Sequence, residues 1–154
     1  MNKIKITSLI IILYIALNGC GYKALLNNDN SINIQEVKTS GDKKIGYILK
    51  NDLLLQSNSA GIKRLKINLE TKKIKSIKDK NNQGRVNSYN ITIDVNLKID
   101  NLQTNQKIEK DFIQSSNYTV STLHTSTINS EKNVVKVLIN QISDEIVNYI
   151  NLNF

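Results

Sequence analysis

The sequence predicts an α+β fold, a two-layer sandwich in which a four-stranded, mostly antiparallel sheet carries two helices on one face. Two patterns predict this class. From Tyr89 to Asp100, apolar and polar residues alternate strictly, which is typical of a half-buried antiparallel strand. Residues 45–56 and 135–150 instead repeat apolar side chains at helical spacing, so each segment has one apolar face. A sheet face and two helix faces of this kind must bury one another.

The first two elements are a strand and a helix. Alternation over residues 31–38 indicates the strand, and residues 39–42 form the loop that follows it. The period then changes, and a helix is expected to begin near Lys43 and to end between residues 57 and 60. The predicted buried stripe of this helix is Ile45, Ile48, Leu49, Leu53 and Gln56.

Two further strands are expected to form a hairpin. The first begins near Leu65, and a lysine-rich segment continues it over residues 71–80. Residues 81–84 (Asn-Asn-Gln-Gly) read as the turn. The alternating run described above is the second strand, and the polar residues 100–105 predict a loop after it.

The last two elements are a strand and a long helix. Residues 106–119 suggest a fourth strand that is less regular and open to a bulge. Ser130 is a candidate N-cap, and Glu131 suits the positive end of the helix dipole. A start near Val120 remains open, because residues 121–127 are rich in Ser and Thr. The predicted stripe is Val135, Leu138, Ile139, Ile142, Ile146, Tyr149 and Ile150.

Composition limits the classes of function. A chain of 154 residues predicts one domain. One Cys excludes an intramolecular disulfide and a multi-cysteine zinc site, and one His excludes a paired-histidine metal site. The net charge of +8 favours an anionic partner such as lipid, sugar or nucleic acid. Asn, Ile and Lys make up 66 residues, so A/T-rich codon usage is an alternative source of the lysines.

The N-terminus predicts an export signal. Two lysines precede an apolar run of nine residues, Leu9 to Leu17. As a helix this run reaches only about 14 Å, too short for a bilayer core of about 30 Å. It therefore indicates a cleaved signal peptide over residues 1–19.

The cleavage region resembles the lipobox of bacterial lipoproteins, with Leu17 and Gly19 before Cys20. In such proteins the Cys carries acyl chains, and three chains anchor a protein lastingly. The alternative is an ordinary secretory signal with an incidental Cys. Gly21, in place of Asp, favours sorting to the outer membrane. The chain then divides into a signal, a lipidated tether at 20–30 and a periplasmic domain at 31–154.

Nothing in the sequence argues for catalysis. His124 lies in a Ser/Thr tract and reads as a surface or helix-start residue. The chain has no Gly-rich phosphate loop, zinc spacing or nucleophile elbow. We expect a protein that is not an enzyme, with no cofactor other than acyl chains on Cys20. A periplasmic enzyme that uses His124 and carboxylates is the less favoured alternative.

Basic residues gather around the predicted hairpin, where nine lie between residues 63 and 85. Nucleic acid is the weaker ligand, because the protein is expected to be exported and the basic segment 63–85 has no aromatic residues for stacking. Phosphorylated glycolipid fits better, and a solvated lysine-rich surface is the alternative. The candidates are Lys72, Lys73, Lys75, Lys78, Lys80 and Arg85.

Three stretches together resemble the lipopolysaccharide-assembly lipoprotein LptE family. They are the mature start Cys20–Leu25, the entry into the alternating strand at 84–91, and 115–118 followed by the closing helix. The resemblance covers the whole mature chain in element order, although this chain lacks the prolines of the family.

The resemblance implies an outer-membrane lipoprotein whose domain sits as a plug inside the LptD β-barrel. Such a protein helps that barrel assemble and helps lipopolysaccharide reach the outer leaflet. In that family, lipopolysaccharide binding is associated with basic residues near this hairpin and near the start of the last helix. The neighbouring residues here are Lys80, Arg85 and Lys132. A generic lipid-anchored periplasmic scaffold, or an accessory of another envelope-assembly machine, is the alternative.

Overall fold

In the computed structural model, residues 32–154 are described, and they form an α+β fold with the element order β-α-β-β-β-α. The predicted signal peptide and the tether at 20–30 lie outside the described residues. The elements are β1 (Ile32–Gly41), α2 (Lys43–Leu55), β2 (Lys63–Lys80), β3 (Val86–Asn101), β4 (Lys107–Thr119) and α3 (His124–Asn153).

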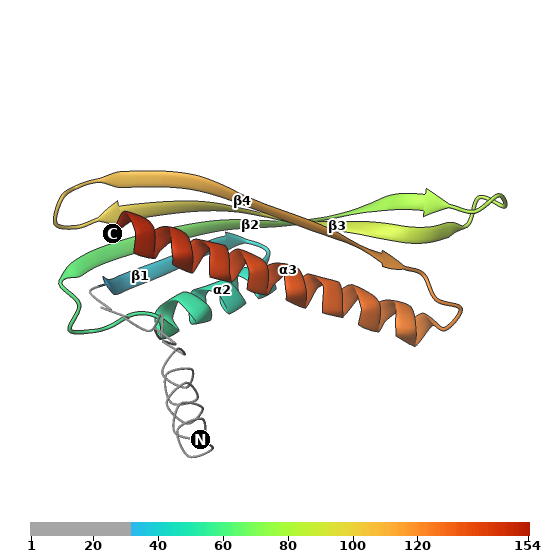
Figure 1. The fold of residues 1–154 in the computed structure, drawn as a ribbon, viewed down its shortest axis with the longest axis horizontal. Helices are drawn as coiled ribbons and strands as arrows, with labels where there is room; N and C mark the ends of the chain where they lie inside the picture. The colour runs from blue at the N-terminus through green and yellow to red at the C-terminus, as the bar shows by residue number, and fades with distance from the viewer. Residues whose placement is uncertain (1–31) are drawn as a thin grey trace, which may run out of the picture.

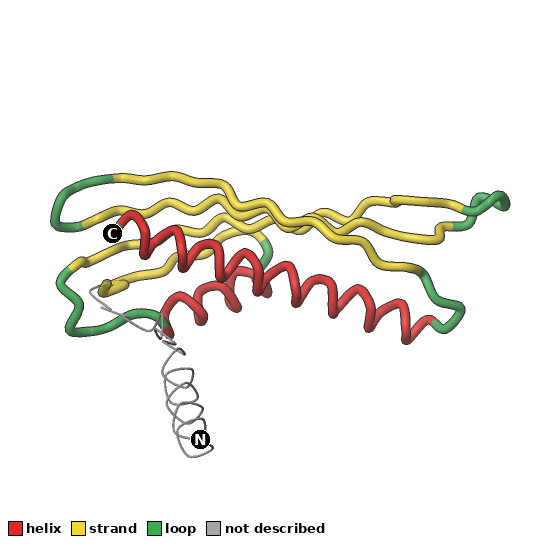
Figure 2. Tube along the Cα trace, viewed as in Figure 1, coloured by secondary structure: helices red, strands yellow, loops and turns green. Residues whose placement is uncertain are grey.

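The four strands form one sheet in the order β1-β2-β3-β4. β1 pairs with β2 in parallel, and the β2–β3 and β3–β4 pairs are antiparallel. Both helices lie on the same side of this sheet (Figure 1), and Figure 2 shows the two layers by element type. The predicted mostly antiparallel, two-layer architecture is therefore confirmed.

The parallel pair requires a sharp junction between β1 and α2. Gly41 has φ +85°, and a Cβ at this position would lie 2.0 Å from the backbone oxygen of Thr71. The backbone N–H of Asp42 donates to that oxygen, and the buried Thr71 hydroxyl donates to the carbonyls of Ser40 and Asp42. Asp42 then caps α2, because its carboxylate accepts from the N–H groups of Lys44 and Ile45.

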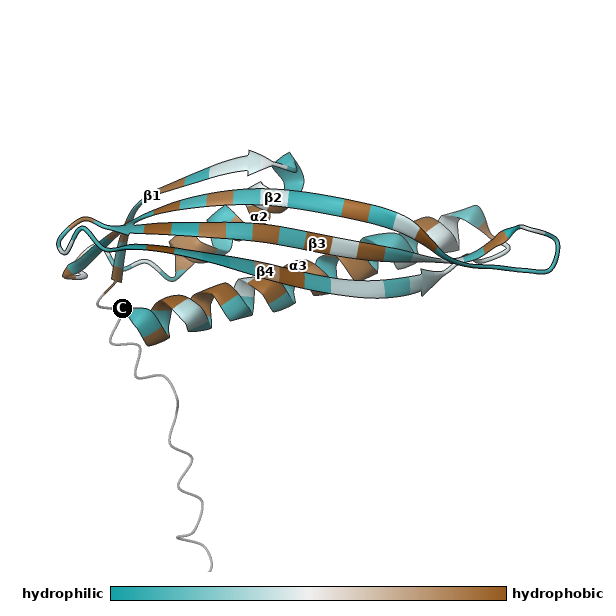
Figure 3. Cartoon of the chain, turned by 90° about the horizontal axis from the view of Figure 1, so that it is seen from above, coloured by the Kyte–Doolittle hydropathy of each residue, from teal (hydrophilic) through white to brown (hydrophobic). Residues whose placement is uncertain are grey.

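The core lies between the sheet and the helices. β3 supplies its centre, because Ile91, Ile93, Val95, Leu97 and Ile99 are fully buried. Figure 3 shows the alternation of hydrophilic and hydrophobic residues along the strands. This alternation is what lets one face of the sheet pack while the other meets solvent.

Both helices bury the predicted stripes except at Gln56, which is exposed because α2 ends at Leu55 and leaves Gln56 as its C-cap. In α2, Ile45, Leu49 and Leu53 are buried. In α3, the stripe from Leu138 to Ile150 is buried, together with Ser143. Val135 and Tyr149 pack against the edge of the core.

The helix bounds differ from the prediction. α2 ends at Leu55, before the expected 57–60, because the chain turns to run along β1: Asn58 donates its N–H to the carbonyl of Ile32. α3 begins at His124 with Leu123 as its N-cap, so the predicted N-cap at Ser130 is wrong and the open alternative, an earlier start near Val120, is closer to the structure. Thr127 accepts instead from the N–H of Ser121, which ties the preceding loop to the first turn.

The strand details also differ. β4 pairs with β3 without a register shift from Lys107 to Thr119, so the expected bulge there is wrong. The irregularities lie in β1, between Ile34 and Glu36, and near the end of β2, between Ile77 and Lys80.

The sheet is longer than its helical cover. In β2 the last core residue is Thr71, and every residue from Lys72 to Lys80 is exposed. The β2–β3 hairpin therefore extends past α2, as Figure 1 shows at the right of the view. This extension carries six of the seven predicted ligand-binding residues.

Candidate functional site

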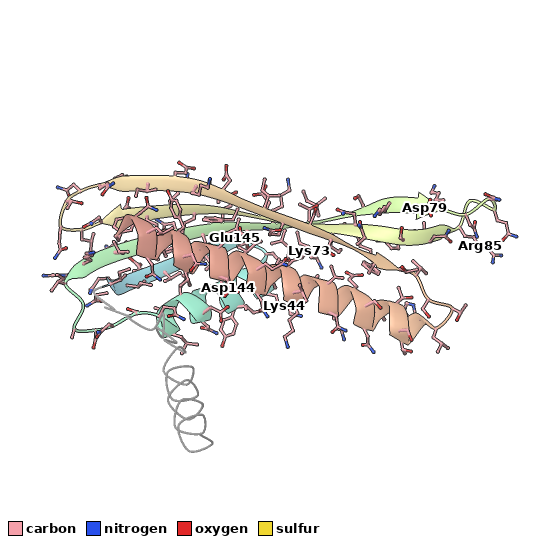
Figure 4. The ribbon with its side chains drawn as sticks, in the orientation of Figure 1. Lys44, Lys73, Asp79, Arg85, Asp144 and Glu145 are labelled. Carbon is pink, nitrogen blue, oxygen red and sulfur yellow. The ribbon has the colours of Figure 1, made fainter. Side chains whose placement is uncertain are left out.

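The predicted basic residues do not form one surface, because successive side chains of a strand point to opposite faces. Lys73 and Lys75 continue the face of β2 that carries Leu65 and Thr71, which is the face toward the helices. Lys72 lies on the other face, opposite Asp94 of β3. Figure 4 places Lys73 beside α3 and Arg85 at the far tip of the hairpin.

Lys73 and Lys75 are held by a carboxylate of α3. The Nζ atom of Lys75 lies 2.6 Å from Oε2 of Glu131, and the Nζ atom of Lys73 lies 3.8 Å from Oε1. The Tyr118 hydroxyl of β4 donates to the same Oε2 atom at 2.7 Å. One carboxylate thus joins β2, β4 and α3, and it lies 56 positions from Lys75 in the sequence.

Two aromatic rings complete this cluster. Tyr89 and Tyr118 are cross-strand partners, and their rings stack with centroids 5.7 Å apart. The Lys75 ammonium lies 4.4 Å from the centroid of Tyr89, within the range of a cation–π interaction. Lys75 is therefore surrounded by a carboxylate and two π-faces.

The cluster shifts the ionisation of its members. The hydrogen bond to Glu131 raises the pKa of Lys75 above its ordinary value, and the hydrogen bond from Lys75 lowers the pKa of Glu131. Burial raises the pKa of Tyr118, which keeps its hydroxyl protonated and donating. At neutral pH Lys75 and Glu131 are both charged and satisfy each other. We infer that Lys73 and Lys75 are less available to an external anion than the sequence suggests.

The hairpin tip, residues 78–85, carries basic side chains that are not paired with carboxylates in the described part of the chain. Within residues 32–154, no ion pair involves Lys72, Lys78, Lys80 or Arg85. The turn is shaped by Asn81, whose side-chain oxygen accepts from the N–H groups of two turn residues. Residues 78–85 hold three basic side chains, those of Lys78, Lys80 and Arg85, and one acidic side chain, that of Asp79, so the tip is net cationic.

Lys132, the seventh predicted residue, lies in α3 and not on the β2–β3 hairpin. It lines a groove of about 340 Å³ between α2 and α3, together with Lys44 and Lys136. The other lining residues are Ile48, Asn133, Val135, Ile139 and Asn140, so no carboxylate lines the groove. Sequence reasoning missed Lys44 and Lys136. The spacing of Lys132 and Lys136 signals one helix face, but only tertiary packing brings Lys44 to them.

The seam between α2 and α3, on which this groove lies, is acidic at its other end. A second groove of about 470 Å³ is lined by Asp52 and Asp144, and it shares Asn140 with the basic groove. The seam between the helices therefore changes sign along its length. An anionic ligand is favoured only at the end near Lys44.

The sole histidine and the carboxylates are the candidate residues for catalysis or metal binding. His124 is the first residue of α3 and is exposed, as the sequence predicted. No group of three His, Cys, Asp or Glu side chains in residues 32–154 is placed to hold a metal ion. Over the same residues, neither helix combines the length and apolarity needed to cross a membrane.

Comparison with known proteins relates the chain to others by fold. No protein-family model matches it, and no curated protein matches it in sequence. Rare lipoprotein B from Shewanella oneidensis superposes with a TM-score of 0.59 at 14% identity, over 75% of this chain and 93% of that one.

Two further solved structures also share the fold at low sequence identity. A minor lipoprotein from Acinetobacter baumannii gives a TM-score of 0.51 at 14% identity, over 77% of this chain and 93% of its own. A putative lipoprotein from Caulobacter crescentus gives 0.50 at 14% identity, over 76% and 85%. The chain therefore shares the fold of these lipoproteins over nearly all of the described domain.

Proposed function

We propose that this protein is an outer-membrane lipoprotein of the LptE type, which occupies an LptD-like barrel and helps lipopolysaccharide reach the outer leaflet. The observation that carries the proposal is the shared fold with rare lipoprotein B, over 93% of that chain. The lipobox-like sequence ends at Cys20, the proposed acylated residue, twelve positions before the described domain begins at Ile32. The protein is not an enzyme under this proposal.

The open face of the sheet supports the part of the proposal that concerns a barrel. The lumen of an outer-membrane barrel is polar, so a plug must present polar side chains. The open face carries charges of both signs in exposed pairs, such as Lys66 with Glu36 and Lys98 with Glu109. Asn96 of β3 donates to Glu109 and Asp111 of β4 on the same face. Such a surface can exchange its water for polar partners without exposing the core.

The basic sites support the part that concerns lipopolysaccharide. Its phosphate groups need cations that are not already neutralised. The hairpin tip and the groove at Lys44, Lys132 and Lys136 both meet this requirement, whereas Lys73 and Lys75 do not. We assign the tip and the groove as the candidate lipopolysaccharide contacts.

The partner is tested by capture of the acylated protein from detergent-solubilised outer membrane, with mass spectrometry of what is retained. We expect a large outer-membrane barrel in stable complex. Depletion of the protein should lower the level of that barrel and of surface lipopolysaccharide. Unchanged levels of both would sink the proposal, and a different envelope partner would favour the generic scaffold.

The ligand contacts are tested with paired charge removals in the acylated protein. Lys78→Gln with Lys80→Gln should weaken binding of purified lipopolysaccharide several-fold, since each phosphate contact is charge-assisted. The control is Lys50→Gln with Lys110→Gln, which removes the same charge elsewhere. An equal loss in both pairs would show that only net charge matters and would remove the tip as a site.

A further inference from the structure

Exposed apolar side chains gather at one end of the long axis. Leu55 and Leu152, at the ends of α2 and α3, are 82% and 85% exposed, and Ile62, in the loop before β2, is 70% exposed. Leu102, in the turn after β3, is 44% exposed. Single exposed apolar residues are ordinary, but here four separate segments bring them to the same end.

Contacts confirm that these segments are neighbours. The side-chain amide of Gln103 donates to the carbonyl of Ile62, and the N–H of Leu102 donates to the carbonyl of Arg64. Gln56 and Asn151, next to Leu55 and Leu152, line one small pocket together with Ile32. Figure 1 shows the two loops and the C-terminus at the left end of the molecule.

The same end receives the chain from the proposed lipid anchor. Ile32 begins the described domain, and Cys20 lies twelve positions before it. Twelve extended residues span at most about 40 Å, so the acylated Cys cannot lie far from this end. The basic hairpin tip is at the opposite end of the long axis (Figure 1).

We propose that this end of the domain docks on the lipid surface, with Leu55, Ile62, Leu102 and Leu152 in contact with the boundary between headgroups and acyl chains. Apolar side chains on amphipathic surfaces insert about 5–10 Å into this boundary. The basic hairpin tip then lies at the end of the domain that is far from this lipid contact (Figure 1). The inference rests on the acylation of Cys20 in the proposed function but not on the barrel or on lipopolysaccharide.

The chain has no Trp, so single tryptophans report on each end. We would place the acylated, full-length Leu55→Trp and Leu152→Trp variants in vesicles of phosphatidylethanolamine and phosphatidylglycerol that contain lipid brominated along its acyl chains. The matched control is Leu123→Trp, since Leu123 is 65% exposed in the loop that leads into α3. We expect both reporters at the tethered end to lose about half or more of their fluorescence, and the control to lose little.

Equal quenching at the three positions would overturn the docking. Blue-shifted emission from Leu152→Trp without quenching would also overturn it, since protein and not lipid would then cover this end. Mass spectrometry of the same samples separates the two proposals. A chain without acyl groups contradicts the proposed function, whereas an acylated but unquenched chain contradicts only the docking.

Discussion

Glu131 has a larger structural role than its position in the sequence indicates. The sequence places it near the start of a helix, where an acidic side chain suits the helix dipole. The structure places it in α3, opposite β2 and β4, where it accepts hydrogen bonds from Lys75 and Tyr118. A single carboxylate therefore ties the first turns of α3 to the part of the sheet that α2 does not cover.

Glu131→Gln is expected to lower the free energy of unfolding by about 1 kcal/mol, because a charge-assisted hydrogen bond is weakened in a half-exposed site. Urea unfolding at neutral pH measures this difference. The control is Asp144→Asn, an exposed carboxylate of the same helix that forms no ion pair within residues 32–154. A loss equal to that of the control would mean that the cluster adds no stability.

The pH dependence of this effect has a definite sign. The pKa of Glu131 is lowered in the folded state from its ordinary value of 4.5, so its contribution is present above that value and disappears as the pH falls through the folded pKa. The pKa of Lys75 is raised from 10.5, so its contribution is complete below 10.5 and is lost as the pH rises through the folded pKa. The difference between wild type and Glu131→Gln should therefore shrink in acid, and a constant difference down to pH 3 would contradict this.

At the scale of elements, the hydrophobic period predicts type and order well. Strict alternation predicted β3, and the apolar stripes at 45–56 and 135–150 predicted the helices. An element that buries one face repeats its apolar residues every two positions in a strand and about every 3.6 positions in a helix. Helix ends were predicted less well. α3 begins at His124 without a side-chain cap, since its start is set by the loop from β4 and not by Ser130.

Ile142→Ala in the middle of α3 is expected to lower the free energy of unfolding by about 3 kcal/mol. Its side chain is fully buried against the sheet, so truncation leaves a cavity. Val137→Ala, on the exposed side of the same helix at 53% exposure, should change stability by less than about 0.5 kcal/mol. Similar losses in thermal or chemical unfolding would mean that the stripe does not carry the packing of α3.

At the scale of the whole molecule, the long axis separates two kinds of surface. One end holds exposed leucines beside the point where the chain enters, and the other holds Lys78, Lys80 and Arg85 with no ion pair within residues 32–154. This separation of an apolar end from a basic end arises because β2 and β3 extend past α2 and place the basic side chains of the hairpin away from the core. The proposed anchor and the hairpin tip are thereby kept apart.

Cys20→Ala is expected to move the protein from the membrane pellet to the soluble or precursor-bound fraction, because the proposed acyl anchor would be lost. Gly21→Asp should keep the anchor but shift the protein toward the inner membrane. Membrane fractionation with immunodetection measures both variants. Unchanged fractionation of Cys20→Ala would indicate that this residue is not the anchor.

The sequence by itself determined the α+β class, the element order and the core faces, because burial of one face leaves its period in the order of residues. It also determined that a basic segment lies on one hairpin. Only the tertiary structure decided which cations are free, because ion pairing depends on which side chains meet across strands and helices. Lys73 and Lys75 share the single carboxylate of Glu131, which lies 56 positions after Lys75, while Lys44 meets Lys132 and Lys136 in the groove between the helices. Long-range contacts of this kind leave no periodic signal, and so they appear only in the fold.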